Sequence, residues 1–465
     1  MGPRKGENGV RTFVTEQERA GRQGDCRDRI VKALYLKAET IAHNVVSEKK
    51  GQGPDWEGKI DDFLTSRFWG FLTMVLLLGA IFWVTITGAN YPSEAIAHFL
   101  CGLEGKLLSF LQLAGAPSWV RGILVLGTYR TLAWVIAVML PPMAIFFPLF
   151  TFLEDLGYLP RVAFNLDYLF KKSGACGKQA LTMCMGFGCN AAGVISCRII
   201  DSPRERLIAV LTNNFVPCNG RFPLLIVLAN LFFAGAAGGR AGSIIPVGVV
   251  VGLTVFGVLV TLFVSSLLTR TILKGVPSQF ALELPPFRLP QPGRILINSL
   301  RNRTLFVLAR AVVVAAPAGL IVWLMANVFV GEVTLLQAAA GFLDPFARGL
   351  GLDGFILMAF ILGLPANEIV LPLLLMAYLS SGAMLELDSL PALKELLVSN
   401  GWTWLTALNV MLFSLLHFPC STTLLTIFKE TGSKKWLFIS FLLPTLLAVA
   451  VIFMVTQGVR LLSLV

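Results

Sequence analysis

Long apolar runs alternate with shorter polar stretches along most of this chain. Five of the runs are close to the roughly 20 residues that a helix needs to cross a bilayer, and they cover residues 71–86, 133–152, 244–268, 305–330 and 438–455. They are continuous and lack the alternation of a barrel strand. Backbone in hydrocarbon must satisfy its own hydrogen bonds, so each run is expected to be a helix. The pattern predicts an all-α, polytopic transmembrane helical bundle.

The first 66 residues are polar and form a separate segment. The Gly- and charge-rich composition of the first 25 residues is typical of disorder. Four apolar side chains then fall close to helical spacing among charged residues: Ile30, Leu34, Ile41 and Val45. They predict an amphipathic helix that lies on the membrane or on a partner.

The remaining polar stretches divide the chain further. Residues 67–130 are predicted to hold the first span and an external or interfacial hairpin over 94–125, interrupted by Gly102, Gly105, Gly115 and Pro117. Residues 131–268 form a first apolar block, and 304–465 form a second block with a C-terminal span. Between them, residues 269–303 are a basic connector whose positive charge predicts a cytoplasmic position.

The two apolar blocks resemble each other. Each opens with a long span that holds a mid-helix proline, then has a short segment interrupted by glycine, and then a Pro-Cys pair. The matching pieces are Pro141–Pro142 and Pro317, residues 186–190 and 363–368, and Pro217–Cys218 and Pro419–Cys420. Paired Gly/Pro-interrupted segments in two halves point to a transporter binding site.

Basic residues flank the interrupted segment of the first block. Lys171, Lys172 and Lys178 precede residues 179–197, and Arg198, Arg204 and Arg206 follow them. Both ends are therefore expected to face the cytoplasm, as in a re-entrant hairpin. Such backbone is tolerated only where protein buries it or where it lines a cavity.

Composition supports a membrane protein. Charged residues make up 14% of the chain, against about 25% in soluble proteins. The net charge of +11 bears on orientation, because Lys and Arg accumulate in cytoplasmic loops. The absence of a basic stripe interleaved with aromatic residues argues against nucleic-acid binding. A cytoplasmic N-terminus is the resulting expectation.

Three of the eight cysteines fall at the predicted helix breaks: Cys189, Cys218 and Cys420. A cysteine at the positive end of a helix has a lowered thiol pKa and favours the thiolate, which binds metal. Thiolates suit soft or borderline divalent ions, whereas Mg²⁺ and Ca²⁺ prefer oxygen. The alternative is that these cysteines are small apolar residues that fill helix contacts.

Oxygen-bearing side chains accompany the cysteines. Glu368 lies within an apolar segment, where a carboxylate is costly and usually faces a polar interior. Its alternative role is an ion pair with a basic side chain of the bundle. Amide oxygens are offered by Asn190, Asn219 and Asn367. The predicted metal-path residues are Cys189, Asn190, Cys218, Asn219, Glu368 and Cys420.

No phosphate-binding G-x-x-x-x-G-K-[ST] motif occurs in the sequence. No nucleotide site is expected in this chain, and neither is catalysis. Any coupling to nucleotide hydrolysis is expected to come from a separate chain.

The motifs, in this order, resemble the membrane region of the ferrous iron transport protein B (FeoB) family. The matching stretches are residues 153–164, 186–190, 204–206, 217–218 with Arg221, and 419–420 followed by 430–436. The similarity extends from about residue 26 and implies two Gate repeats that form an Fe(II) path. It assigns a metal-path role to Cys189, Cys218 and Cys420. Glu368 matches an intramembrane Lys-Glu pair, with Asn367 in place of the lysine.

Proteins of this type usually begin with a GTPase domain, and this sequence begins at what would be the linker after it. Either the sequence is a shortened form, or the GTPase is a separate polypeptide for which residues 1–66 are a natural docking surface. A small accessory protein and a second copy of the chain are further candidate partners, beside membrane lipid and the divalent ion.

The leading hypothesis, which rests on this resemblance, is a divalent metal permease in a prokaryotic inner membrane, with Fe(II) as the transported substrate. Two alternatives stay open at this point. One is a Gate-type transporter of an organic solute such as a nucleoside, because half-helix ends and Asn/Glu pairs serve that function too. The other is a non-transporting membrane scaffold or signalling protein.

Overall fold

The computed structural model describes residues 56–66, 68–233, 241–275, 286–287, 290–379 and 390–462, together with residue 30, 33–42 and 44–45. Within this part, four helices are long and apolar enough to cross a membrane: Ser118–Asp155, Ile245–Arg270, Trp404–Thr431 and Lys434–Leu461. The number rises to six if two bent helix pairs each count as one span. The predicted polytopic helical bundle is confirmed.

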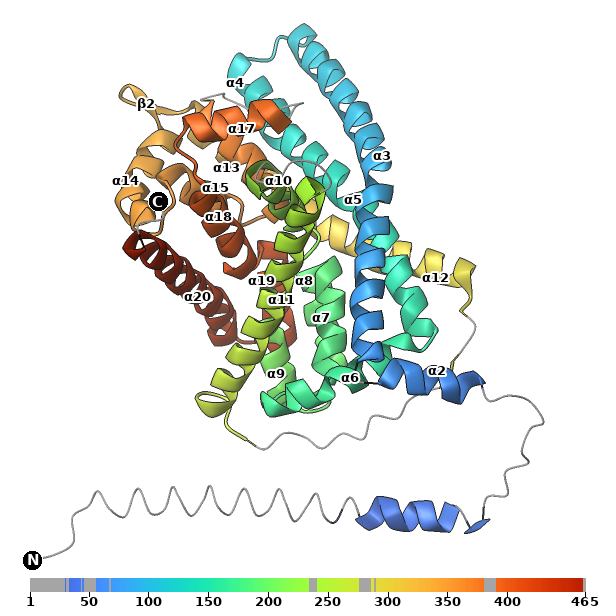
Figure 1. Ribbon diagram of the computed structural model, residues 1–465. Coiled ribbons are helices and arrows are strands. Elements are labelled where there is room, and N and C mark those ends of the chain that lie inside the picture. Colours follow the sequence, from blue (N-terminus) through green and yellow to red (C-terminus); the bar gives the residue numbers. More distant parts are fainter. Residues whose placement is uncertain are drawn as a thin grey trace, which may run out of the picture.

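The chain enters the bundle through α2 (Trp56–Thr65), which meets α3 (Trp69–Leu113) at 88°. Arg161, buried on α6, pairs with Asp61 of α2 at 2.8 Å and lies 3.9 Å from the centre of the Phe287 ring. This ion pair fixes α2 across the end of the bundle (Figure 1). Residues 33–42 are helical as predicted, and Leu34 and Ile41 on them are exposed. The prediction for residues 1–25 lies outside the described residues.

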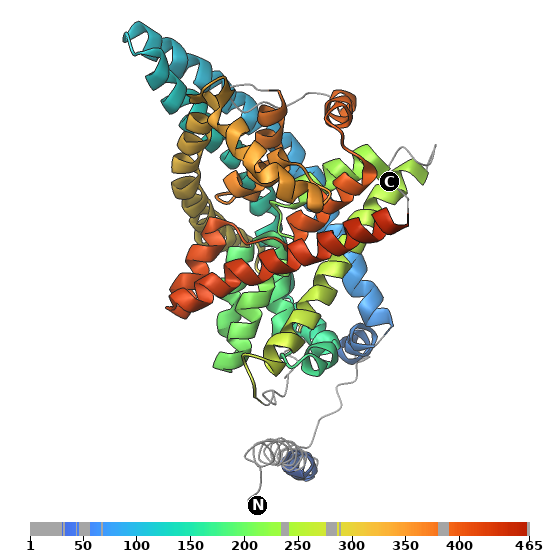
Figure 2. The same ribbon diagram turned by 90° about the vertical axis from the view of Figure 1, so that its left-hand side faces the viewer.

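The hairpin near residues 94–125 is longer and more regular than the glycines indicate. Gly102 and Gly105 lie inside the 45-residue α3, and the chain turns at Gly115, whose φ is +70°. The second arm consists of α4 (Ser118–Arg121) and the π-helical η1 (Gly122–Tyr129). Figures 1 and 2 both show its tip projecting from the bundle. The expectation that Gly102 and Gly105 interrupt this segment is wrong, because the helix tolerates glycines on an open face.

The first block contains two long helices with shorter, broken ones between them. Its elements are α5 (Arg130–Asp155), α6 (Tyr158–Lys172), α7 (Lys178–Gly188), α8 (Asn190–Ser196), η2 (Cys197–Ile199), α9 (Pro203–Thr212), η3 (Asn213–Phe215), α10 (Phe222–Phe233) and α11 (Ala241–Arg270).

The second block follows α12 (Pro292–Asn298) and the π-helical η5 (Ser299–Thr304). It has α13 (Leu305–Asn327), an antiparallel pair of strands β1 (Phe329–Val330) and β2 (Val333–Thr334), α14 (Leu335–Gly349), α15 (Gly354–Leu362), η6 (Asn367–Ile369), α16 (Val370–Tyr378), α17 (Leu390–Ser399), α18 (Trp404–Leu416), α19 (Ser421–Thr431) and α20 (Lys434–Leu461). Figure 2 shows α20, in red, crossing the bundle obliquely.

One end of the bundle, here called the basic end, is held together by Lys178, Arg198 and Arg204. Lys178 at the start of α7 pairs at 2.7 Å with Asp201, which follows η2, so α7 and α8 form a hairpin that begins and ends here. The ammonium of Lys178 also holds the pKa of Asp201 below its usual range. The predicted re-entrant geometry of this segment is confirmed. The break lies at Cys189, just after the Gly-Phe-Gly, rather than within it.

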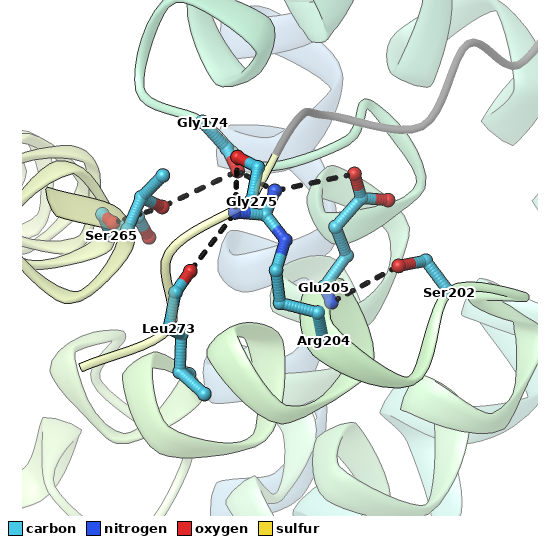
Figure 3. Close-up of polar contacts among 8 residues, drawn as sticks. Gly174, Ser202, Arg204, Glu205, Ser265, Leu273 and Gly275 are labelled. Atoms are coloured by element: carbon cyan, nitrogen blue, oxygen red, sulfur yellow. Dashed lines mark hydrogen bonds and ion pairs between the residues drawn. The ribbon is translucent and has the colours of Figure 1, made fainter. Parts of the chain in front are cut away.

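Arg204, in the first turn of α9, ties two turns together at the same end. Its guanidinium donates to the carbonyl oxygens of Gly174, Leu273 and Gly275 at 3.0–3.1 Å (Figure 3). These carbonyls belong to the turn before α7 and the turn after α11. The basic end therefore joins the starts of α7 and α9 to the finish of α11.

The opposite end of the bundle is joined by a different set of contacts. Tyr378 at the end of α16 donates a hydrogen bond to Asp353, which precedes α15. Trp402, before α18, donates to the Tyr378 hydroxyl at 2.8 Å and stacks on Phe232 of α10. The α15–α16 hairpin therefore begins and ends at this opposite end.

The two hairpins thus enter from opposite ends, and their tips meet inside the bundle. The broken helix pairs show the same inversion, since α9–α10 runs away from the basic end and α18–α19 runs towards it. With 11 residues in α7 and 1.5 Å per residue, the tip lies about 16 Å from the basic end. That depth is about half of a hydrocarbon layer roughly 30 Å thick.

Each broken helix leaves backbone groups without helical partners, and in the second block a side chain of the first block satisfies several of them. Arg221 is fully buried and donates to the carbonyl oxygens of Leu415, His417 and Phe418 at the end of α18, and to Asn214. Within the second block, the Ser421 N–H that opens α19 bonds to the Leu364 carbonyl at 2.8 Å. Arg221 is therefore the residue of the first block that holds the break of the second.

Replacing Arg221 with Met should be strongly destabilising. The change leaves several buried carbonyl groups without donors, and we expect a loss of about 3 kcal/mol or more. Thermal unfolding of the purified chain in detergent measures it, with the exposed Arg460→Met as the matched control. Equal melting temperatures for the two variants would contradict this role.

Candidate functional site

A cavity of about 30 Å³ lies where the two hairpin tips and the two broken helices meet. Five of the six predicted metal-path residues line it: Cys189, Asn190, Cys218, Glu368 and Cys420. The sixth, Asn219, is not among the lining residues. Cys189 and Cys420, which are 231 positions apart in the sequence, therefore line the same buried cavity. The paired helix breaks predict this convergence.

Two of the cysteines sit at helix starts, as expected. Cys189 is the N-cap of α8, in extended conformation with φ −157°, and Cys420 is the N-cap of α19. Neither helix has a side-chain cap. The first-turn N–H groups of both helices are therefore directed towards the cavity, and their partial positive charge favours an anionic group such as a thiolate.

Cys218 departs from the expected geometry. The Pro-Cys pair was predicted to open a helix, but α10 begins only at Phe222. Cys218 instead starts a turn in which its carbonyl accepts from the Arg221 N–H at 2.9 Å. The reason is Arg221, whose side chain must reach the end of α18 and holds this segment out of the helix. Asn219, in the same turn, is half-buried and lies off the cavity.

Glu368 lies in η6, at the tip of the second hairpin, with no ion-pair partner in the part of the chain that the structure describes. The ion-pair alternative is therefore not realised there. Its carboxylate rests against Gly220, where an added Cβ would lie only 2.1 Å from Oε1. Gly220 is thus needed for close approach of the turn before α10 to the tip of the second hairpin.

Amide groups add oxygen atoms to the cavity wall. Asn190 and Asn367 are 3% and 6% exposed, and the buried Oδ1 of each has no hydrogen-bond partner among the described residues. The other atom of the Asn190 amide is fixed, because its Nδ2 donates to Asn214 Oδ1 at 3.4 Å. Buried polar atoms are normally bonded, so two unpartnered oxygens at one cavity point to a cationic or hydrogen-bonding occupant.

Sequence reasoning missed two lining residues, Met139 and Met143 of α5. Both are buried, and their spacing of four places them on one face of the helix. The spacing alone could have paired them, but it could not show that this face meets the cysteines. Opposite them on α13, the lining residue is Ala311.

The lining groups are not closed around a point. Within the described residues, no group of three or more His, Cys, Asp and Glu side chains is arranged as a ligand set for one ion. The described residues therefore line a cavity without forming a complete coordination site around one ion.

Two family models match the chain. The Gate family, described as nucleoside recognition, matches residues 136–232 and 308–434, and these two segments contain the two hairpins with their broken helices. The family of the ferrous iron transport protein B C terminus matches residues 250–301. No solved structure matches the chain.

Relatives with curated names share this similarity. The chain is 26% identical over 429 residues to the Fe(2+) transporter FeoB of Staphylococcus aureus strain MSSA476, covering 90% of this chain and 61% of the relative. It is 26% identical over 435 residues, with the same coverage, to the Fe(2+) transporter FeoB of Methanocaldococcus jannaschii. A fusion of Fe(2+) transport protein A with FeoB from Porphyromonas gingivalis is 24% identical, covering 85% of this chain and 51% of the relative. The chain thus spans about three-fifths of the length of the first two.

The inverted hairpins, the broken helices and the two Gate segments define a polytopic membrane protein with paired Gate repeats. Within that class, the chain is similar to proteins named Fe(2+) transporter FeoB over 90% of its length.

Proposed function

We propose that this chain is a permease for a divalent metal ion, with Fe(II) as its substrate. The observation that carries the proposal is the convergence of Cys189, Cys218, Cys420 and Glu368 on one buried cavity. Thiolates and carbonyl-type oxygens together suit a borderline divalent ion. An ion that enters would exchange its water for these groups, held weakly enough to leave again. The names of the relatives support iron as the substrate.

The size of the cavity disfavours an organic solute. A volume of about 30 Å³ has room for roughly one or two water molecules, whereas pockets for small organic ligands are about 300 Å³ or more. The nucleoside alternative would require a far larger space between the same tips. A non-transporting scaffold has no evident need for unpartnered oxygens beside three cysteines.

The charge distribution supports an orientation. Lys178, Arg198, Arg204 and Lys429 all lie at the basic end, which also receives α2. By the preference of Lys and Arg for the cytoplasmic side, the basic end and the N-terminus face the cytoplasm. For a prokaryotic chain this membrane would be the cell's inner membrane.

Replacement of all three cysteines by serine tests the metal proposal. Serine keeps size and polarity but loses the soft ligand, so Fe(II) uptake into proteoliposomes should fall by about tenfold or more. Cys101→Ser, at an exposed position, is the matched control. Intact transport by the triple variant would contradict the proposal of a metal permease and favour the organic-solute or scaffold alternatives.

A second test uses the contact between Gly220 and Glu368. Gly220→Ala keeps the Glu368 carboxylate but displaces it, because the added Cβ would clash with Oε1. Cd(II) binding, measured by calorimetry, should therefore weaken by roughly tenfold, which is the usual effect of losing a group that supports a metal site. Glu368→Gln should weaken it similarly. Gly252→Ala is the control, because an added Cβ there meets nothing within 4 Å. Unchanged affinity in both site variants would exclude Glu368 as a ligand.

The energy source is expected to be a GTPase on a separate chain that docks on residues 1–66. A small accessory protein is a further candidate partner, because one relative is a fusion of Fe(2+) transport protein A with FeoB. Co-purification of a small GTPase with the chain, lost when residues 1–55 are removed, is the expected result. GTP-independent iron uptake at full rate by this chain alone would contradict the coupling.

A further inference from the structure

Two methionines line the same cavity as the three cysteines, and the proposed path does not yet account for them. Met139 and Met143 are the two methionines of α5, they are 8% and 2% exposed, and both line the cavity. The helix periodicity that places them on one face also places them one turn apart along the passage.

The opposite walls supply the other sulfur atoms. Cys189 comes from the first hairpin, Cys218 from the turn before α10 and Cys420 from the start of α19. Five sulfur-bearing side chains therefore surround a space with room for roughly one or two waters. An ion in so small a space contacts most of the lining, including the α5 wall.

Thioethers and thiols make different contributions to such a lining. A thioether is soft, uncharged and has no proton to lose, whereas a thiol binds metal as its anion. Thioethers therefore favour thiophilic ions without adding negative charge that would trap a divalent cation. The competing explanation is that these methionines only fill gaps in the core, as methionine often does.

We propose, resting on the permease function above, that Met139 and Met143 are specificity-determining residues that bias the passage towards thiophilic divalent ions and against oxygen-preferring ones such as Mn²⁺. In this proposal, an ion that binds the cysteines also contacts Met139 and Met143. The sulfur atoms of α5 then set the preference, and Glu368 with the amide oxygens supplies the charge and polarity common to all divalent ions.

The variant Met139→Leu/Met143→Leu tests this inference, because leucine conserves volume and lacks the sulfur. Cd(II) and Mn(II) binding to the purified full chain would be measured by calorimetry. We expect Cd(II) affinity to fall by about tenfold and Mn(II) affinity to change by less than about twofold. The matched control is Met183→Leu/Met185→Leu on α7, at buried methionines that do not line the cavity. It should change neither affinity.

An unchanged ratio of Cd(II) to Mn(II) affinity in the α5 variant would overturn the inference. If that double variant does not fold, selenium-edge absorption of the selenomethionine-labelled, Cd(II)-loaded wild-type chain decides: a cadmium–selenium distance supports the inference, and its absence refutes it. The permease proposal fails separately, when the wild-type chain transports no Fe(II) into proteoliposomes. A wild-type chain that transports Fe(II) while the α5 variant keeps its ion preference refutes only the methionine assignment.

Discussion

The structure depends on keeping broken backbone hydrogen-bonded at the centre of an apolar bundle. A helix that stops in hydrocarbon exposes N–H and C=O groups that lipid cannot satisfy. Here the first block satisfies the break of the second: Arg221 bonds the carbonyls that end α18 and Asn214 donates to the His417 carbonyl, while within the second block Leu364 accepts from the start of α19. The break between α18 and α19 therefore depends on contacts from the first block.

The same arrangement places opposing charges close together. The starts of α8 and α19 and the guanidinium of Arg221 bring positive charge towards the cavity, and Glu368 and the cysteines bring negative charge or the capacity for it. The helices α8 and α19 pack on each other, and Arg198 and Glu430 join their far ends in a two-bond ion pair of 2.6 and 2.8 Å. The cysteine ends of these helices are thereby coupled to one contact at the basic end.

Much of this architecture could be predicted from the sequence, because hydrophobic length and glycine or proline breaks are local signals. The re-entrant first hairpin, the paired breaks and the caps at Cys189 and Cys420 follow from residue spacing. The turn at Cys218, the position of Asn219 and the contribution of Met139 and Met143 do not. Each of these depends on a contact across the fold: Arg221 with the end of α18, and α5 with the hairpin tips. The sequence also did not predict that α3 continues as a regular helix through Gly102 and Gly105. Glycine costs little stability at these positions, because no neighbouring side chain packs there.

The small volume of the cavity has a kinetic consequence. For the proposed permease, a space of about 30 Å³ is too small for a cation with its full shell of water, so the ion would lose water before the lining side chains contact it. Mg²⁺ keeps its water tightly and gives it up reluctantly. The cost of dehydration would therefore disfavour Mg²⁺ before the sulfur atoms of the lining influence the choice of metal.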